Sequence, residues 1–183
     1  MGSARESMAA RRSLSKVTAE APSDEELVRL LAAAGRAADH ATLHPWRVIA
    51  LRGAARERLG RAFVEHAGLS GEAAEKLAAK PLRASLLLAV VVRIVPSEKV
   101  DEWEQEAAAA GVAHYLSLLL DEAGWGVMWR SGHHTRSEPV ARMHGLGDDE
   151  RLLGWLYVGG VPESGKPARH ELPDAAASFS VLD

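Results

Sequence analysis

The sequence predicts an α/β chain in which one sheet of about four strands lies among helices. Three observations support this class. Leu86–Val92 is apolar at successive positions, as expected for a central strand that helices cover on both faces. Residues 101–123 form the longest helical pattern and are nearly apolar all round, so this helix is expected to be buried in the core or against a partner. Shorter helical and strand-like segments alternate along the rest of the chain.

The first half of the chain is expected to hold one strand and several helices. In order, these are a short helix within 4–12, a helix from Ser23 or Asp24 to about Asp39, a strand at Trp46–Leu51, a helix at Ala54–His66 and a helix from Gly71 to Pro81. The second of these helices has a polar cap and two glutamates in its first turn, where negative charge meets the positive end of the helix dipole. Proline closes the last helix because it cannot continue the hydrogen-bond ladder.

The second half of the chain alternates strand and helix. The expected segments are a strand at Leu86–Val95, a helix at 101–123, a strand at Trp125–Trp129, a helix at Glu138–His144 and a strand at Leu152–Val158. Past Gly159, the Pro, Gly and Ser content predicts an extended tail over 160–183. We expect one domain over 1–183, in which 1–8 is either a native start or a disordered or tag-derived one.

The composition limits the classes of function. With 183 residues, a net charge of -3 and 47% apolar residues, the chain resembles one soluble globular domain without an overall basic field, so nucleic acid is not an expected partner. The absence of cysteine excludes disulfides, thiolate metal sites and a cysteine nucleophile, and it fits a reducing cytoplasm. No apolar run approaches the about 20 residues that span a bilayer, so no membrane association is expected. The glycine motifs of Rossmann dehydrogenases, P-loop enzymes and serine hydrolases are missing, so any redox chemistry must come from a bound cofactor.

Three short segments carry groups suited to a ligand with a phosphate and a planar ring system: Arg11-Arg12-Ser13, Arg36 to His40, and Trp129-Arg130-Ser131-Gly132. Arginine offers a planar fork of donors to phosphate oxygens, and a neighbouring hydroxyl adds another donor. The strand end at Trp129–Gly132 would also expose backbone N–H groups. Taken alone, the arginine pair is more typical of a solvated basic stretch, and Trp129 is typical of a core residue at a strand end.

The histidines do not predict a metal site. His40 and His44 are four residues apart, but Pro45 pushes His44 toward an extended conformation, so the two are not expected to share a helix face. His133 and His134 are neighbours, and neighbouring side chains on a strand point apart. A solvated loop is the favoured interpretation of that pair, and no metal is predicted.

Taken in order, these segments resemble the nitroreductase family of flavin enzymes, and within it the small single-domain members. The resemblance covers the chain from about residue 9 to the C-terminal tail and rests on five pieces: Arg11–Ser13; Leu30–His40 leading to Pro45-Trp46; Trp103–Glu106; Gly124–Gly132; and Gly154–Gly159. It implies an α+β fold with a central mixed sheet and a homodimer with FMN at the interface. It further implies electron transfer from NADH or NADPH through the flavin to a nitro-aromatic, a quinone or a similar small acceptor.

The resemblance also implies roles for particular residues. Arg11, Arg12 and Ser13 match the family motif for the phosphate and ribityl chain of FMN, Arg36 and His40 match positions that reach a flavin from the partner subunit, and Trp129, Arg130 and Ser131 match the loop beside the cofactor. A weaker match to a nicotinamide-contacting stretch covers Leu119, Leu120, Asp121, Glu122, Ala123 and Gly124. No protein acid or base is implied as catalytic, because the flavin N5 takes the hydride.

The chain departs from the family pattern at two places. Many relatives carry a lysine two residues after the motif serine, whereas this chain has Ser15 there, followed by Lys16. Larger relatives end with basic residues that grip the phosphate, for which Lys166 and Arg169 are the candidates here. Two alternative functions stay open: a non-catalytic protein that stores or delivers FMN, and a cofactor-free interaction module built on the helix at 101–123.

Overall fold

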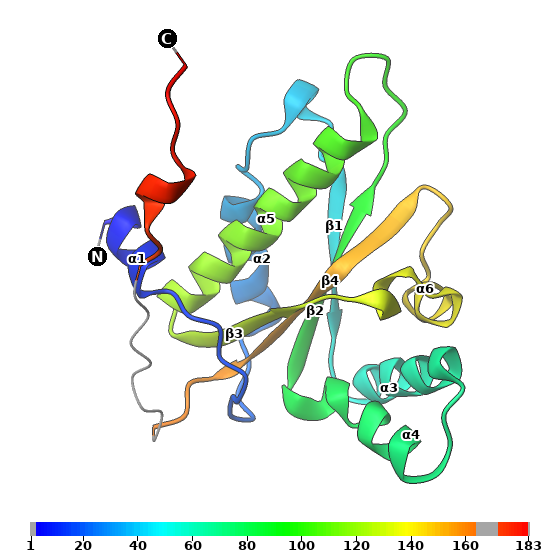
Figure 1. Cartoon of the computed structure of the whole chain (residues 1–183). Helices are drawn as coiled ribbons and strands as arrows, with labels where there is room; N and C mark the ends of the chain where they lie inside the picture. The colour runs from blue at the N-terminus through cyan, green and yellow to red at the C-terminus, as the bar shows by residue number, and fades with distance from the viewer. Residues whose placement is uncertain (1–2, 164–171, 183) are drawn as a thin grey trace.

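The computed structural model describes residues 3–163 and 172–182, so Lys166 and Arg169 lie outside the described residues. A four-stranded sheet lies between two groups of helices (Figure 1). On one face pack α2 (Asp24–Ala34) and α5 (Glu102–Glu122). The other face carries α3 (Ala54–Ala67), α4 (Gly71–Ala78) and α6 (Glu138–His144). The α+β class with about four strands is confirmed.

The sheet is antiparallel at every strand pair in the described part of the chain, so the mixed sheet implied by the resemblance is wrong. The strands are β1 (Trp46–Leu51), β2 (Leu86–Arg93), β3 (Trp125–Arg130) and β4 (Glu150–Gly160), in the order β1-β2-β4-β3. The long helix α5 returns the chain across the sheet, so β2 and β3 run in the same direction. Because β4 lies between them and runs the opposite way, no two neighbouring strands are parallel.

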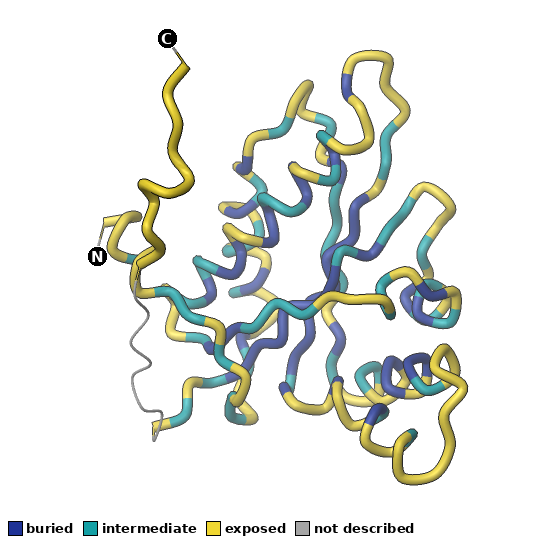
Figure 2. The backbone as a smooth tube through the Cα atoms, viewed as in Figure 1, coloured by how far each residue is buried: buried dark blue, intermediate teal, exposed yellow. Residues whose placement is uncertain are grey.

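The central strand β2 is buried on both faces, as the sequence predicted. Leu86, Leu88 and Val90 pack on the α2 and α5 side, and the alternate residues of β2 pack on the α3, α4 and α6 side. This alternation follows from the period of two in a strand. Figure 2 shows the resulting buried centre, with exposed residues concentrated in the loops and on the outer faces of the helices. The strands β1, β2 and β4 thus each contribute residues to both cores.

Most element bounds agree with the sequence within a few residues, but α2 ends earlier than expected. It stops at Ala34 with Gly35 as its C-cap, so residues 36–39 are not helical. A β-carbon on Gly35 would lie 2.8 Å from the Trp46 ring, which shows how closely β1 approaches this helix end. The helix therefore ends at a glycine against which Trp46 packs closely.

The remaining elements are short. They are α1 (Ala4–Ala10), whose capping box joins Ser3 and Glu6, and four 3-10 turns: η1 (His40–Thr42), η2 (Lys80–Arg83), η3 (His133–Arg136) and η4 (Ala175–Ser178). In α5, residues such as Val112 and Leu116 face the sheet, whereas Trp103 and Tyr115 are exposed. The helix expected to be buried all round is therefore buried on one face in this chain. In the described residues, no helix is long and apolar enough to cross a membrane.

Candidate functional site

A cavity of about 510 Å³ opens where β3 ends, on the sheet face that carries α3 and α4. Its walls are aromatic side chains from α3 and β4, with the end of β3 and the loop after it at one side: Phe63, Trp155, Tyr157, Trp129, Ser131 and Gly132. Gly132 has φ +127, a conformation that other residues rarely adopt, and it turns the chain out of the strand into η3. The strand end predicted to face a ligand does line a cavity.

The cavity is positively charged. Lys80, Arg83 and Arg130 line it, and no carboxylate of the described residues does. The Arg130 guanidinium carbon lies 5.3 Å from the centroid of the Tyr157 ring, and Arg130 Nε is buried without a hydrogen-bond partner among the described residues. Burial raises the pKa of Tyr157 to about 12, although Arg130 and Arg83 oppose that shift. A planar or anionic ligand would find both aromatic surface and unsatisfied positive charge here.

Trp129 is held at the cavity wall by a close approach of β3 to β4. A β-carbon on Gly154 would lie 2.5 Å from both Trp129 Nε1 and the Arg130 carbonyl oxygen, so only glycine allows this packing. The indole also meets His114 edge-on, with ring centroids 4.9 Å apart. Its Nε1 is buried and has no hydrogen-bond partner in the described part of the chain. This donor lies on the α5 face, opposite the Arg130 side chain, because neighbouring residues of a strand point to opposite faces of the sheet.

The N-terminal arginine motif lies along the same strand. The Leu14 N–H donates to the Val127 carbonyl at 2.9 Å, which fixes the segment after Ser13 to the middle of β3. Val127 and Arg130 are separated by three strand residues, or about 10 Å. Arg11 and Arg12 lie close to Asp121: burial raises the pKa of this carboxyl, and the two arginines partly oppose the shift. The structure therefore brings the first and third sequence segments to one edge of the sheet.

The stretch Leu119–Gly124 forms the last turn of α5 and the turn into β3. Leu120 is fully buried in the core, so its side chain does not face a surface ligand. Asp121 is half-buried beside Arg11 and Arg12, and the three residues after it are exposed. This stretch thus adjoins the N-terminal motif.

Arg36 and His40 do not lie at the cavity where β3 ends. Both are exposed, and His40 lines a separate groove of about 660 Å³ against α5, where Trp103 and Tyr115 are also exposed. Neither of the two is among the residues that line the cavity at β3. Since α5 covers one face of the sheet and the cavity lies on the other, Arg36 and His40 lie away from the cavity of their own chain.

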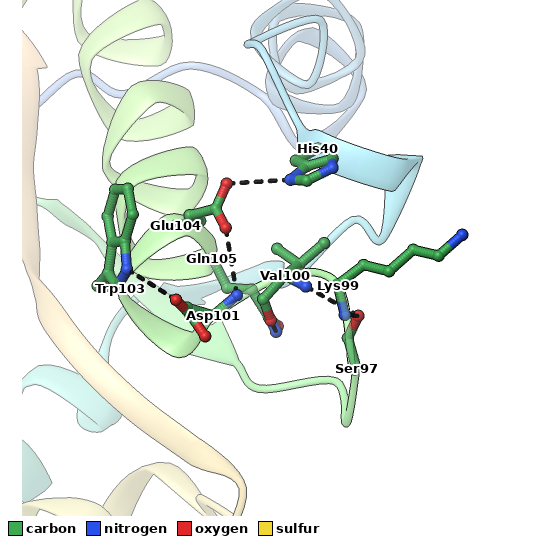
Figure 3. A network of polar contacts seen from close by, with 8 residues as sticks. All are labelled: His40, Ser97, Lys99, Val100, Asp101, Trp103, Glu104 and Gln105. Atoms are coloured by element: carbon green, nitrogen blue, oxygen red, sulfur yellow. Dashed lines mark hydrogen bonds and ion pairs between the residues drawn. The ribbon is translucent and has the colours of Figure 1, made fainter.

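A polar network holds His40 in place (Figure 3). Its Nδ1 lies 3.0 Å from Glu104 Oε2, and this contact lowers the pKa of Glu104. Glu104 also accepts a hydrogen bond from the Asp101 N–H, which completes the capping box at the start of α5. The helix cap and the His40 contact therefore share one carboxylate.

The turn that follows His40 is strained. Ala41, Thr42 and His44 have φ between +48 and +61, a range that favours glycine, and the His44 N–H donates to Asp39 Oδ2 at 2.7 Å. The prediction that His40 and His44 do not share a helix face is confirmed, because this segment turns rather than continuing α2.

The expectation that the side chains of His133 and His134 point apart is wrong. The two residues begin a 3-10 turn rather than extending the strand, so their rings lie together with centroids 4.1 Å apart. The His134 ring stacks on Phe63 at 4.4 Å. Burial, followed by the positive charge of His133, His66 and Lys80, lowers the pKa of His134 to about 4, so this ring is neutral at neutral pH.

Lys80 and Arg83 are not among the site residues predicted from the sequence, yet they supply two of the three cations that line the cavity. Both belong to η2, directly before the buried strand β2. A signal was present in Lys80-Pro-Leu-Arg83, where two cations flank a helix stop next to a central strand. Because these residues are far in sequence from the three predicted segments, their place in the same cavity could not be predicted.

Comparison with known proteins identifies the family. The model of the nitroreductase family matches residues 8–160. The chain is 32% identical over 167 residues to "Putative NAD(P)H nitroreductase YdjA" of Escherichia coli strain K12, covering 90% of this chain and 91% of the relative. The structure is similar to that of a nitroreductase-like family protein from Bacillus cereus, with TM-score 0.84, 22% identity and coverage of 100% of this chain and 97% of that one. It is also similar to the FMN and NADPH-dependent nitroreductase NfnB of sphigopyxis sp. strain HMH, with TM-score 0.75, 19% identity and coverage of 99% of each chain. The chain belongs to the nitroreductase family.

Proposed function

We propose that the protein is an FMN-dependent oxidoreductase, which takes electrons from NADH or NADPH and passes them to a small acceptor such as a nitro-aromatic or a quinone. One observation carries the proposal: among the described residues, the cavity at the end of β3 combines aromatic walls with three cations and no lining carboxylate, in a chain of the nitroreductase family. When bound, FMN supplies hydride acceptance and release at its N5.

The residues present fit this cofactor. Arg130 holds a buried Nε–H without a partner among the described residues, and a flavin offers acceptors on its pyrimidine edge. Ser131 adds a hydroxyl at the cavity rim. In our proposal, Arg11, Arg12 and Ser13 bind the phosphate, because they follow the same sheet edge and provide the planar fork that phosphate prefers.

The cavity also suggests which cations set the flavin potential. This chain has Ser15 where many relatives have lysine, so positive charge near the pyrimidine ring must come from another residue. Lys80, Arg83 and Arg130 are the candidates because they line the same cavity. Fixed positive charge there favours the reduced, negatively charged ring and so assists hydride transfer from the nicotinamide. Hydride transfer requires the nicotinamide ring to lie against the flavin, whereas Leu119–Gly124 of the same chain lies at the opposite end of β3, about 20 Å from the cavity, so we assign no nicotinamide contact to that stretch within one chain.

We further propose a homodimer in which each flavin is completed by the partner chain. Arg36 and His40 lie on the α5 face, away from the cavity of their own chain, and beside them Trp103 is 67% exposed. An exposed aromatic groove on a helix face is typical of a protein interface.

The shared site predicts that Arg36→Ala lowers FMN affinity although Arg36 lies far from the cavity of its own chain. Losing one charged hydrogen bond corresponds to about 1.5–3 kcal/mol, or roughly 10- to 150-fold in Kd. Flavin fluorescence titration measures this, with Arg29→Ala as the matched control because Arg29 is an exposed arginine of α2. Equal affinity in both variants would exclude a contact between Arg36 and flavin.

The function itself is tested by absorption and rapid mixing. We expect the purified protein to be yellow, to release FMN identified by mass, and to lose its flavin absorbance when mixed anaerobically with NADH or NADPH. Addition of a quinone or nitro-aromatic should restore that absorbance. A flavin that neither nicotinamide reduces would instead indicate a non-catalytic FMN-binding protein, and a colourless protein that refuses FMN would contradict the cofactor assignment.

A further inference from the structure

Three histidines from two elements meet at the rim of the cavity: His66 in the last turn of α3, and His133 and His134 in η3. Each offers a ring nitrogen, and these three atoms lie within 4.8 Å of one another. The ring centroid of His66 lies 5.7 Å from the ring centroid of His133 and 5.4 Å from that of His134. We propose that this cluster binds a divalent transition-metal ion of the zinc class.

Small side-chain rotations would bring the three nitrogens to metal distances. Zn–N bonds of 2.0–2.1 Å in a tetrahedral site place ligand nitrogens about 3.3 Å apart. His66 and His133 are exposed and free to rotate, whereas His134 is anchored by its stack on Phe63. The cluster thus combines one fixed ligand with two adjustable ones, and no backbone movement is needed.

The His134 ring also carries an unsatisfied atom. Its Nδ1 is buried and has no hydrogen-bond partner within 3–163 or 172–182. Buried polar ring nitrogens normally have a partner, so the exception requires an explanation. Binding a metal through the imidazole, or ordering the ring beside one, would account for a histidine kept at this position.

The local field favours a cation on one side and opposes it on the other. His66 lies at the C-terminal end of the 14-residue helix α3, where the helix dipole stabilises positive charge. Lys80 lies close enough to His134 to oppose a second positive charge, but it is exposed and therefore screened by solvent and salt. Three imidazoles without a thiolate or carboxylate suit Zn²⁺, Ni²⁺ or Cu²⁺ and not Mg²⁺ or Ca²⁺.

Three protein ligands leave a coordination position open, as in sites that bind water or an exogenous ligand. Because His133 and His134 also line the cavity, the bound ion would adjoin it. The site does not depend on the identity of the cavity ligand, and it goes beyond the proposed flavin chemistry.

Equilibrium dialysis of Zn²⁺ against chelator-treated protein tests the proposal, with and without added FMN. We expect one bound Zn²⁺ per chain that is weakened at least about tenfold in His133→Gln and in His66→Gln, since even the loss of an outer-shell partner costs 10–100-fold. His44→Asn is the matched control, because His44 is an exposed histidine outside the cluster and asparagine tolerates its φ of +48. The control should bind like the parent protein, and Mg²⁺ should not compete.

Thermal unfolding gives an independent readout: at equal Zn²⁺ concentration, the Tm should rise more in the parent and in His44→Asn than in the two cluster variants. Both cluster substitutions are at exposed positions, so the variants should fold. Zn²⁺ binding that is equal in the parent and in both cluster variants, or absent from the parent, would overturn the site. Either result can be obtained whether or not the protein proves to be a flavin reductase.

Discussion

Replacing Arg130 with methionine removes one cation from the cavity at the end of β3 while keeping most of the side-chain volume. Within the described part of the chain, Arg130 Nε has no hydrogen-bond partner, and the recorded contact of the guanidinium is with the face of Tyr157. The folded chain therefore loses little when the charge is removed. A bound anionic cofactor, by contrast, loses a charged donor.

The two effects can be estimated separately. A partly exposed cation–π contact contributes about 0.5–1 kcal/mol, and relief of repulsion from Arg83, which also acts on Tyr157, offsets part of this loss. A hydrogen bond from a charged group to the ligand corresponds to about 1.5–3 kcal/mol. Arg130→Met should therefore weaken FMN roughly 10- to 150-fold while the stability of the apoprotein changes by less than about 1 kcal/mol.

The assay pairs a flavin fluorescence titration with denaturant unfolding of the flavin-free protein. Arg58→Met provides the control, because Arg58 is an exposed arginine on α3 that does not line the cavity. Unchanged FMN affinity would refute the assignment of Arg130 to the cofactor. A parallel fall in affinity and stability would indicate instead that Arg130 supports the fold.

Three further outcomes are expected. Arg11→Ala should weaken FMN by about 1.5–3 kcal/mol but leave riboflavin nearly unaffected, since only FMN has a phosphate; equal losses in the two titrations would argue against a phosphate contact. Glu150 accepts hydrogen bonds from Arg47 at 2.5 and 2.6 Å, and these bonds lower the pKa of Glu150 in the folded state. The stability that this carboxylate contributes is therefore fully present above the ordinary glutamate pKa of about 4.3, and it is lost as the pH falls through the lower folded-state pKa. Thermal unfolding of Glu150→Gln should thus show a lower Tm at pH 7, and a deficit that persists undiminished in acid would contradict this linkage. Gly60→Ala would place a β-carbon against the Ala78 carbonyl, where α3 meets α4. In denaturant unfolding, this should lower the free energy of unfolding by about 1–3 kcal/mol, whereas Arg61→Ala at the exposed neighbouring position should lower it by less than about 0.5 kcal/mol. Equal stability of the two variants would exclude the close approach.

The sequence predicts element positions best where one physical rule dominates. β2 is recognisable because every residue from Leu86 to Val92 is buried, so its apolar run needs no knowledge of the partners. α6 begins and ends as expected because proline lies in its first turn and Gly145 has the left-handed C-cap conformation. The predicted end of α2 is too late: the helix stops at Ala34 with Gly35 as its C-cap, where Trp46, eleven residues after Gly35, packs closely.

The candidate site is less predictable because its parts meet only in three dimensions. Trp129 to Ser131 can be selected from a local strand-end pattern, but Lys80 and Arg83 join them only through the order of the strands. The same limit explains His133 and His134: a strand would separate the two rings, whereas the turn after Gly132 brings them together. The turn begins at Gly132, whose φ of +127 favours glycine, and His134 then packs against Phe63.

The net charge of the chain does not indicate the cation that matters most for ligand binding, Arg130. Much of the positive charge is paired within the fold, as in Arg47 with Glu150 and Arg151 with Glu102, and other arginines such as Arg58 are exposed to water. Arg130 belongs to neither group, because its Nε is shielded from solvent without an acceptor among the described residues. An arginine nitrogen in that position costs free energy in the unliganded fold. Its position at the wall of the cavity is best explained by an acceptor that the chain itself does not provide.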